Sequence, residues 1–367
     1  MSDTSLVLSN HGLRHSGGIE RYLLTLVDSL HARGTRPTVI AHKFDKTIPE
    51  YAWVNPIHIH TWGLGGALRD RWFDLRLRRL KARHQWFPLI ALSQTSAADI
   101  AICGGTHPGY LAAIDQAPSW KDKLAISLEA KHLGQASIVI AHSELMARQV
   151  KQFYGIAPDK VNVLYPPVDT QRFHPVSQQR KQALREQLGL PPDRCVFLLA
   201  STGHARKGLD LLVKALGHSD LPVLLVVAGR PVDMQAPNLR YLGYRNDIEG
   251  VYRAVDCTVM ASRYEPFGLV GVETVLCGTP LVGAEGMGCM EVLQGDAVIP
   301  FKIDASDSQQ ASLQDAIQQV LSRWRTGTLQ VADPLKGLRY DPTVDAHLQA
   351  LLGHVDQLRA QRSGRAI

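Results

Sequence analysis

Two glutamates in the second half of the chain have the spacing of a pair that could grip one ligand. Glu265 and Glu273 lie eight residues apart in the stretch SRYEPFGLVGVETVLCGTP, residues 262–280. Glu265 falls in a loop, and Glu273 lies about two turns into a predicted helix. Such carboxylates can hold hydroxyls at two separated points, while backbone amides at the helix start can bind phosphate. Taken alone, this spacing also fits a surface loop that leads into an ordinary amphipathic helix.

A basic pair occurs in the segment GHARKGLD, residues 203–210, just after a predicted apolar strand. Arg206 and Lys207 fall where that strand ends and a helix begins. Cations at a helix N-terminus oppose the helix dipole, and an anionic ligand would resolve this conflict. The sequence contains no Asp-x-Asp motif that could hold a divalent metal. The pair therefore predicts a metal-free site for an anion, with a solvated basic helix start as the alternative.

Two loops in the first half of the chain carry glycines at predicted strand ends. Gly17 and Gly18 precede a predicted helix and allow a ligand to approach the backbone closely. The second loop, CGGTHPG over residues 103–109, contains His107, which could hydrogen-bond a sugar or an acceptor hydroxyl. The chain has 15 histidines, so a structural or solvent-exposed role for His107 is an equally good interpretation.

The elements that must position these residues alternate between strands and helices throughout the chain. Alternation of this kind predicts a parallel sheet with helices on both faces. We predict strands at 5–9, 37–41, 57–61, 98–103, 137–141, 195–200, 223–228, 241–243, 257–261 and 280–283. We predict helices at 19–33, 178–188, 208–216, 247–255, 268–277 and 344–362.

The double proline in LYPPVD, residues 164–169, interrupts this alternation and predicts a stiff connection between two domains. We predict an α/β fold with two doubly wound, Rossmann-like domains, residues 1–167 and 168–343. The helix at about 344–367 is expected to cross back onto the first domain. Ligands of such sheets bind at the carboxyl ends of the strands, so we expect a cleft between the two domains.

Composition sets broad limits on the class of protein. The 367 residues, 45% hydrophobic and 20% charged, suffice for two domains with a real core. The formal net charge of +6 would suit an anionic partner, although colloidal solubility is the simpler explanation. Five widely spaced cysteines without a Cys-x-x-Cys pair predict free thiols in a reducing compartment. The N-terminus lacks a signal-peptide pattern, so we expect a cytoplasmic protein.

A basic segment with interleaved aromatic residues covers 69–87 and reads RDRWFDLRLRRLKARHQWF. This pattern suits the interface of an anionic membrane, where it would hold the protein peripherally on the inner face of the cytoplasmic membrane. A helix with a solvated basic face is an equally good interpretation. No nucleic-acid-binding module accompanies the segment, so we do not expect a nucleic-acid partner.

The stretch around Glu265 and Glu273 resembles the Glu-x7-Glu motif of the retaining glycosyltransferases of family 4, which have the GT-B fold. The resemblance extends from the glycine pair to the last helix. It implies that Glu265 lies beside the transferred sugar and that Glu273 holds the ribose hydroxyls. It also implies that Arg206 and Lys207 take the place of a metal at the diphosphate.

The resemblance extends to further residues of the expected site. The loop GYRND, residues 243–247, resembles the family loop at the nucleobase, while Gly229 and Arg230 end a strand that points to the same region. The expected substrate-binding residues are Gly17, Gly18, Gly203, Tyr244, Arg245, Phe267, Gly268, Leu269 and Glu273. The expected catalytic residues are Arg206, Lys207, Glu265 and His107. We expect neither a metal nor another cofactor.

Within this family, the segments 206–210, 245–247 and 164–167 resemble those of bacterial lipopolysaccharide-core glucosyltransferases. This implies transfer of a hexose to a glycan or lipid-linked acceptor, with UDP-glucose expected first and other UDP-hexoses or GDP-mannose next. Glu265-Pro-Phe267 stands where those enzymes often have Glu-Ala-Ala, which leaves the sugar open. A sugar-nucleotide epimerase, a phosphorylase or a non-catalytic glycan-binding subunit are the alternative functions.

Overall fold

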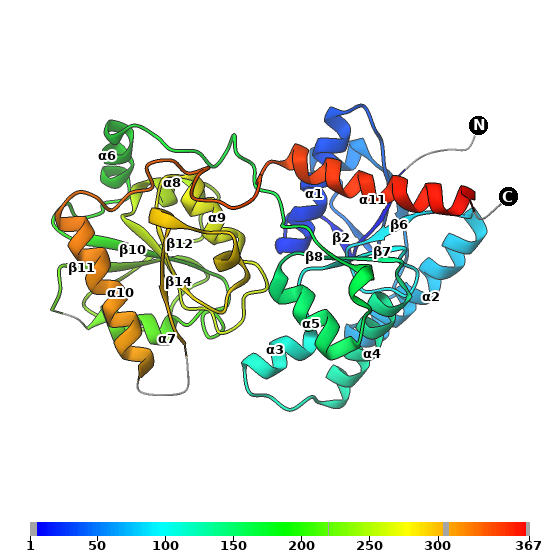
Figure 1. Cartoon of the computed structure of the whole chain (residues 1–367), viewed down its shortest axis with the longest axis horizontal. Coiled ribbons are helices and arrows are strands. Elements are labelled where there is room, and N and C mark those ends of the chain that lie inside the picture. Colours follow the sequence, from blue (N-terminus) through cyan, green and yellow to red (C-terminus); the bar gives the residue numbers. More distant parts are fainter. Residues whose placement is uncertain (1–5, 219, 304–307, 365–367) are drawn as a thin grey trace. The chain divides into compact units, whose positions relative to one another are not determined.

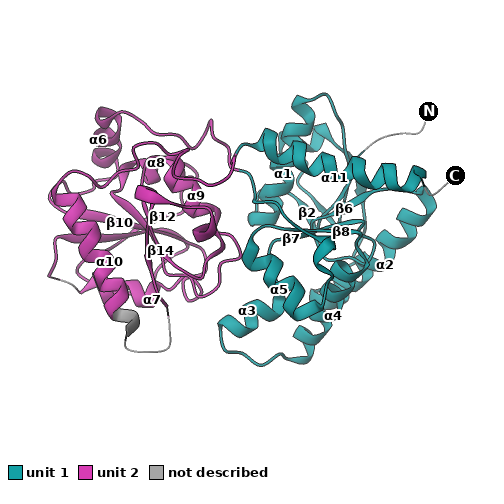
Figure 2. Ribbon diagram, in the orientation of Figure 1, with its two compact units in different colours: residues 1–167, 343–367 teal, residues 168–342 magenta. Residues whose placement is uncertain are grey.

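The computed structural model describes residues 6–218, 220–303 and 308–364. The chain divides into two compact units (Figure 2). Unit 1 comprises residues 1–167 and 343–367, and unit 2 comprises residues 168–342. The chain leaves unit 1 immediately after the double proline and returns to it with the last helix.

Unit 1 is built on a parallel seven-stranded sheet in the order β5-β3-β1-β6-β7-β8-β9. Its strands are β1 (Val7–Ser9), β3 (Thr38–Ala41), β5 (Asn55–His58), β6 (Leu89–Ala91), β7 (Ile100–Cys103), β8 (Ile138–Ala141) and β9 (Val161–Val163). A separate parallel pair joins β2 (Gly12–Leu13) to β4 (Lys43–Phe44). The central strands are fully buried, as their continuous apolar sequences require in a sheet covered on both faces.

The described residues of unit 1 form six α-helices. They are α1 (Gly18–Ala32), α2 (Gly66–His84), α3 (His107–Ala113), α4 (Trp120–Gln135), α5 (Glu144–Tyr154) and α11 (Val344–Gly364). Figure 1 shows α1 and α11 on one side of the sheet and α4 and α5 on the other. Leucines of α1 and α11 share one hydrophobic core with β1 and β6, so the last helix is an integral part of unit 1.

A buried polar contact also fixes α11 to unit 1. Nε2 of His347 lies 2.6 Å from the hydroxyl of Tyr22 in α1, and Nδ1 lies 2.9 Å from the carbonyl oxygen of Tyr165. Both ring nitrogens of this buried histidine are therefore paired. Burial lowers the pKa of His347 to about 4, so the ring is neutral at pH 7.

Unit 2 repeats the same architecture with a parallel six-stranded sheet in the order β12-β11-β10-β13-β14-β15. Its strands are β10 (Cys195–Ser201), β11 (Val223–Gly229), β12 (Leu239–Gly243), β13 (Cys257–Met260), β14 (Leu281–Ala284) and β15 (Val298–Phe301). Its helices are α6 (Gln178–Gln187), α7 (Leu209–Leu212), α8 (Ile248–Ala254), α9 (Leu269–Leu276) and α10 (Ser308–Arg325), and a π-helical turn over Val213–Gly217 extends α7.

Both sheets reverse their strand order at one point. In unit 1 the chain builds outward from β1 through β3 to β5, and then continues on the other side of β1 with β6. In unit 2 the same reversal occurs between β10 and β13. Ligands of doubly wound sheets bind beyond the carboxyl ends of the strands at such a switch point. The topology therefore marks one candidate ligand-binding edge in each unit.

The predicted fold class, two parallel doubly wound α/β sheets, is confirmed. The strand predicted at 57–61 lies earlier in the chain, since β5 covers Asn55–His58. This strand can include Pro56 because it lies at the edge of the sheet, where the missing N–H of proline costs no hydrogen bond between strands. The prediction for 5–9 begins at residue 5, outside the described residues. All five cysteines are buried free thiols, as predicted. Among the described helices, none is long and apolar enough to cross a membrane.

Candidate active site

The switch point of unit 2 carries a compact ionic cluster. Lys207 follows β10 and its Nζ lies 2.5 Å from Oε2 of Glu265, which follows β13. Nη1 of Arg206 lies 3.2 Å from the same oxygen and 2.7 Å from the carbonyl oxygen of Tyr264. The Ser262 hydroxyl donates to this carboxylate at 3.3 Å. The fold thus brings three of the four predicted catalytic residues into direct contact.

Glu265 is an ionised acceptor in this cluster. Its burial alone would raise the pKa of the carboxyl, but the charges of Lys207 and Arg206 and their hydrogen bonds lower the pKa below its usual value. Lys207 is buried, whereas Arg206 keeps about a third of its side chain exposed. Two cations around one carboxylate leave an excess of positive charge that an anionic ligand can use.

Backbone geometry explains how the basic loop approaches β13. Gly208 has a φ of +70°, and a Cβ at this position would lie 2.2 Å from the carbonyl oxygen of Ala261. Only glycine allows this close passage of the two loops. Arg263 then fastens them, since its backbone amide donates to Arg206 O at 2.9 Å and its guanidinium forms a bidentate pair with Asp210.

The start of α9 lies next to the carboxylate. Gly268 is the residue before this helix, with a φ of +94°, and no side chain caps the helix N-terminus. A Cβ on Gly268 would lie 2.9 Å from Cγ of Glu265, so the glycine sets the distance between the carboxylate and the helix start. The carbonyl oxygen of Phe267 accepts from Cys289 N at 2.6 Å. The predicted diphosphate-binding residues Phe267, Gly268 and Leu269 therefore adjoin the ionic cluster.

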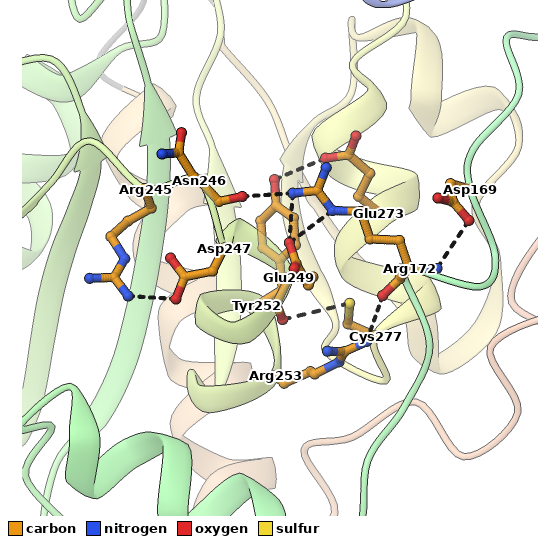
Figure 3. Close-up of polar contacts among 10 residues, drawn as sticks. All are labelled: Asp169, Arg172, Arg245, Asn246, Asp247, Glu249, Tyr252, Arg253, Glu273 and Cys277. Carbon is orange, nitrogen blue, oxygen red and sulfur yellow. Dashed lines mark hydrogen bonds and ion pairs between the residues drawn. The ribbon is translucent and has the colours of Figure 1, made fainter. Parts of the chain in front are cut away.

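Glu273 is buried on α9 and belongs to a second polar group, drawn in Figure 3. Its Oε2 accepts a hydrogen bond from the hydroxyl of Tyr252 on α8 at 3.1 Å. In the same group, Arg172 binds Glu249 at 2.7 Å and the carbonyl oxygen of Asn246 at 2.9 Å. Glu273 is thus held by hydrogen bonding rather than lying on the helix surface, which excludes the simple amphipathic-helix interpretation.

The loop after β12 presents the residues predicted for the nucleobase. Tyr244 is largely exposed, and Arg245 donates to the carboxylate of Asp247 at 2.6 Å, a contact drawn in Figure 3. This pair lowers the pKa of Asp247, mainly through the hydrogen bond from the guanidinium. The loop therefore offers an aromatic ring at the surface beside a fixed guanidinium.

Gly203 and Arg230 lie at the ends of neighbouring strands. His204 links them, because its Nδ1 lies 2.9 Å from Ser201 Oγ and its Nε2 lies 3.2 Å from Arg230 O. A Cβ on Gly203 would meet no atom within 4 Å, so packing inside the protein does not require glycine here. Space beside this backbone remains open to a ligand.

His107 belongs to unit 1, where it begins α3 rather than lying in a free loop. Its Nε2 lies 2.7 Å from Oδ1 of Asp122, and its backbone amide donates to Glu129 at 2.9 Å. Hydrogen bonds from Ser119 and, second, from His107 lower the pKa of Asp122 to about 2. A carboxylate therefore orients the imidazole. This arrangement occurs in the acid–base pairs of enzymes and also in pairs that serve only the structure.

Gly17 and Gly18 begin α1, with no side-chain cap and with backbone angles open to any residue. A Cβ on Gly18 would meet no atom within 4 Å. Neither the backbone conformation nor internal packing explains the glycine at position 18. The role predicted for the pair, contact with a ligand, stays a prediction.

Four contributors to these sites were not predicted: Tyr252, Ser262, His204 and Asp122. Tyr252 is a buried tyrosine in a helix, whose hydroxyl needs a partner, and this is the one signal that sequence reasoning could have used. Ser262 and His204 lie next to glycine-containing loops, and Asp122 lies in the first turn of α4. Only the fold shows the partners of these three residues.

Two parallel doubly wound units, with a cationic pair beside a carboxylate at one switch point, define a GT-B-type glycosyltransferase. Comparisons with known proteins agree. Residues 16–172 match Glycosyltransferase Family 4, and residues 180–328 match Glycosyl transferases group 1. The chain is 41% identical to a probable transglycosylase from Burkholderia thailandensis over 94% of this chain and 95% of that protein. The chain therefore belongs to this glycosyltransferase family and is a transferase enzyme.

Further relatives are more distant. A D-inositol 3-phosphate glycosyltransferase from Mycobacterium sp. (strain JLS) is 30% identical over 70% of this chain and 57% of its own length. WaaG, a glycosyltransferase involved in lipopolysaccharide biosynthesis, superposes with a TM-score of 0.73 at 14% identity, covering 88% of this chain and 92% of WaaG. HepE from Anabaena, solved with UDP-glucose, gives a TM-score of 0.73 at 20% identity, covering 96% of this chain and 100% of HepE. At these identities the two structures support the fold.

Proposed function

We propose that the protein is a retaining, metal-independent glycosyltransferase that moves a hexose from a UDP-sugar, UDP-glucose first, to a glycan or lipid-linked acceptor of the cell envelope. The observation that carries the proposal is the contact of Lys207 and Arg206 with Glu265 at the switch point of unit 2. HepE, which shares the fold, was solved with UDP-glucose, and WaaG is described as acting in lipopolysaccharide biosynthesis. Both names support the choice of donor and acceptor class.

In the proposed site, the diphosphate of the donor lies against Lys207, Arg206 and the uncapped start of α9. Lysine supplies a point charge and arginine a fork of donors, which together can stabilise the charge that develops on the leaving diphosphate. The helix N-terminus adds its backbone amides and its dipole. A divalent metal would have the same task, so these residues make it unnecessary.

Glu265 orients the sugar in this proposal, and Glu273 with Tyr252 binds the ribose. The acceptor oxygen forms a bond to the anomeric carbon on the face from which the diphosphate leaves. The bond from that carbon to the phosphate oxygen breaks, and the acceptor proton passes to a phosphate oxygen. The configuration at the anomeric carbon is then retained. The protein contributes mainly position and charge stabilisation.

We further propose that unit 1 contacts an anionic membrane surface through α2 and the loop before it. A hollow of about 780 Å³ is lined by arginines of α2, by Trp86 and Phe87 just after this helix, and by Arg362 of α11. Trp62 and Leu68, just before and at the start of α2, are largely exposed. Exposed aromatic and aliphatic side chains among arginines suit the interface of a bilayer with anionic headgroups. This would place a cytoplasmic enzyme at the inner face of the membrane.

The test is a reaction with UDP-glucose and an alkyl glucoside acceptor in the presence of EDTA, with the product analysed by NMR. The proposal predicts UDP release and an α-linked product, because the donor is an α-glucoside. A β-linked product, or activity that needs added metal, would contradict the mechanism. Conversion of the donor to another UDP-hexose without acceptor would instead identify an epimerase, and turnover that depends on bound pyridoxal phosphate would identify a phosphorylase.

A further inference from the structure

The first residues of unit 2 after the double proline are fastened to the loop after β12 and to α8. The segment 169–174 is where the chain enters unit 2. The backbone amide of Arg172 donates to the carboxylate of Asp169 at 3.0 Å, which fixes the turn from which the arginine side chain leaves. Figure 3 shows this side chain pointing toward Asn246 and Glu249.

The guanidinium of Arg172 joins two parts of unit 2 that follow each other in the chain. Its Nη2 lies 2.9 Å from the carbonyl oxygen of Asn246, in the loop before α8, and 2.7 Å from Oε2 of Glu249, in the first turn of α8. Its Nε donates to the same carboxylate oxygen at 2.9 Å. One planar fork thus holds both the loop and the helix, which a lysine, a flexible point charge, cannot reproduce.

The start of α8 depends on this contact from outside the helix. Asp247 is the residue before α8, and within the described residues its carboxylate pairs with Arg245 instead of capping the helix. The angle at which the loop enters α8 is therefore set by Arg172. The side chains of Arg172 and Glu249 are 38% and 22% exposed, and pairs as exposed as this add little to stability. The contact consequently matters more for geometry than for stability.

The same helix carries Tyr252, whose hydroxyl donates to Glu273 at 3.1 Å. Glu249 and Tyr252 are three positions apart and therefore lie on one side of α8. The ring of Tyr252 also packs against Phe173, the neighbour of Arg172, with 6.1 Å between the ring centroids. A shift of α8 would move the Tyr252 hydroxyl, so the contacts lead from Arg172 through the helix to Glu273.

We propose that Arg172 is a positioning residue for the nucleotide part of the donor. It fixes the loop 244–247, which is expected at the base, and it fixes α8, whose Tyr252 orients Glu273 for the ribose. Arg172 acts through the loop and the helix rather than by touching the donor. This role rests on the function proposed above, while the positioning of the loop can be tested without any ligand.

The test compares Arg172→Lys and Arg172→Met with Arg185→Lys as a matched control. Arg185 also binds a carbonyl oxygen and a carboxylate of unit 2, those of Ala254 and Asp256, each at 3.0 Å. Ala254 ends α8 and Asp256 precedes β13, so these partners lie at the other end of α8 from the loop. Both lysine variants keep the positive charge and remove the fork. If charge alone mattered, Arg172→Lys would behave as the wild type.

Hydrogen exchange of the ligand-free proteins, measured by mass spectrometry, tests the positioning directly. The peptide over residues 244–250 includes the amide of Gly250, which donates to the carbonyl oxygen of Asp247 at 3.0 Å. Both Arg172 variants should exchange this peptide about fivefold faster, as expected for the loss of one hydrogen bond. Arg185→Lys should exchange it at the wild-type rate. Equal rates in the wild type and in Arg172→Met would overturn the proposal.

Steady-state transfer from UDP-glucose measures the consequence for the reaction. Both Arg172 variants should raise the KM for the donor about fivefold, with a change in kcat below about twofold, because the contact serves binding of the nucleotide. Arg185→Lys should lower the melting temperature and leave the donor KM unchanged. A donor KM of Arg172→Lys equal to that of the wild type would show that the Arg172 contacts serve only the structure.

The two proposals fail in different ways. If the wild type transfers glucose from UDP-glucose and Arg172→Lys leaves the donor KM unchanged, the transferase proposal stands and the role of Arg172 is overturned. If the wild type binds no nucleotide sugar while the Arg172 variants speed exchange, the transferase proposal fails. Arg172 then remains the residue that positions the loop and α8.

Discussion

Nζ of Lys207 and Oε2 of Glu265 lie 2.5 Å apart, although 58 positions separate these residues in the chain. The contact exists because β10 and β13 are neighbours in the sheet and both end at the switch point. It couples the residue proposed to neutralise the diphosphate to the one proposed to orient the sugar. Stability and activity can therefore be separated by changing the two residues singly and together.

Glu265→Gln should lower the free energy of unfolding by about 3 kcal/mol, because it leaves the buried Lys207 without its counter-charge. Lys207→Met should lower it by less, because Glu265 keeps the guanidinium of Arg206 at 3.2 Å. The double variant should recover most of this loss, since neither charge remains. Transfer activity should be lost in all three proteins. Urea denaturation and donor turnover measure the two effects, and a double variant that recovered activity would show that the pair is only structural.

Gly203→Ala should leave stability within about 0.5 kcal/mol of the wild type, because a methyl group there meets no protein atom within 4 Å. Donor affinity should nevertheless fall if the donor approaches this backbone, as the predicted substrate-binding role of Gly203 implies. Gly353→Ala, at an exposed position of α11, is the control, with equally open space and no expected effect on the donor. Unchanged donor binding in Gly203→Ala would remove this glycine from the site.

Tyr252→Phe removes the hydroxyl that donates to Glu273 at 3.1 Å. The cost in stability should be about 1 kcal/mol, that of one hydrogen bond. If Glu273 binds the ribose, the KM for the donor should rise severalfold, with little change in kcat. Steady-state kinetics with UDP-glucose would measure both constants, and an unchanged donor KM would speak against this role for Glu273.

Two buried histidines should make unit 1 sensitive to acid. Burial, together with the neighbouring His347, lowers the pKa of His142 to about 3, and burial lowers that of His347 to about 4. Their unfolded value is 6.5, so between pH 6.5 and about 4 the unfolded chain binds more protons than the folded chain. The free energy of unfolding should therefore fall as the pH falls through this range.

Each of these histidines can contribute up to about 3 kcal/mol to that loss. Urea denaturation at a series of pH values would measure it. His142→Phe should flatten the dependence, because one of the titrating groups is then missing. Equal stability at pH 7 and pH 4.5 in the wild type would contradict the assignment of both rings as buried and neutral.

Two arginines of α2 that line the hollow, Arg78 and Arg79, should govern binding to anionic vesicles. Arg78→Glu with Arg79→Glu should abolish sedimentation with phosphatidylglycerol vesicles, because charge attraction is worth about 1 kcal/mol per basic residue at such a surface. Arg180→Glu with Lys214→Glu in unit 2 is the matched control, since both side chains are exposed and distant in sequence from α2. Equal loss in both double variants would indicate net charge alone rather than these two arginines.

Much of the fold could be predicted from the sequence. The helix α1 and the strands β10 and β11 were predicted to within about two residues, because long apolar periodic or continuous stretches leave little choice. The strands β6 and β9 were missed, since three residues carry no measurable period. They become strands because neighbouring strands in the sheet supply their hydrogen-bond partners.

The candidate site could be predicted less completely. Residue type and local spacing indicated Lys207, Arg206 and Glu265 as separate candidates. Their mutual contact depends on the order of the strands in the sheet, which no local sequence pattern contains. The pairing of His107 with Asp122 and of Tyr252 with Glu273 depends on packing between helices.

We propose that unit 2 binds a nucleotide sugar without metal through Lys207 and Arg206. Calorimetric titration of UDP-glucose, other UDP-sugars and GDP-mannose in EDTA would measure this binding, using the wild type and the Lys207→Met/Glu265→Gln variant. We predict that a UDP-sugar binds the wild type in EDTA and binds the variant at least about tenfold more weakly. Binding that appears only after metal is added, or that is equal in the two proteins, would contradict the account.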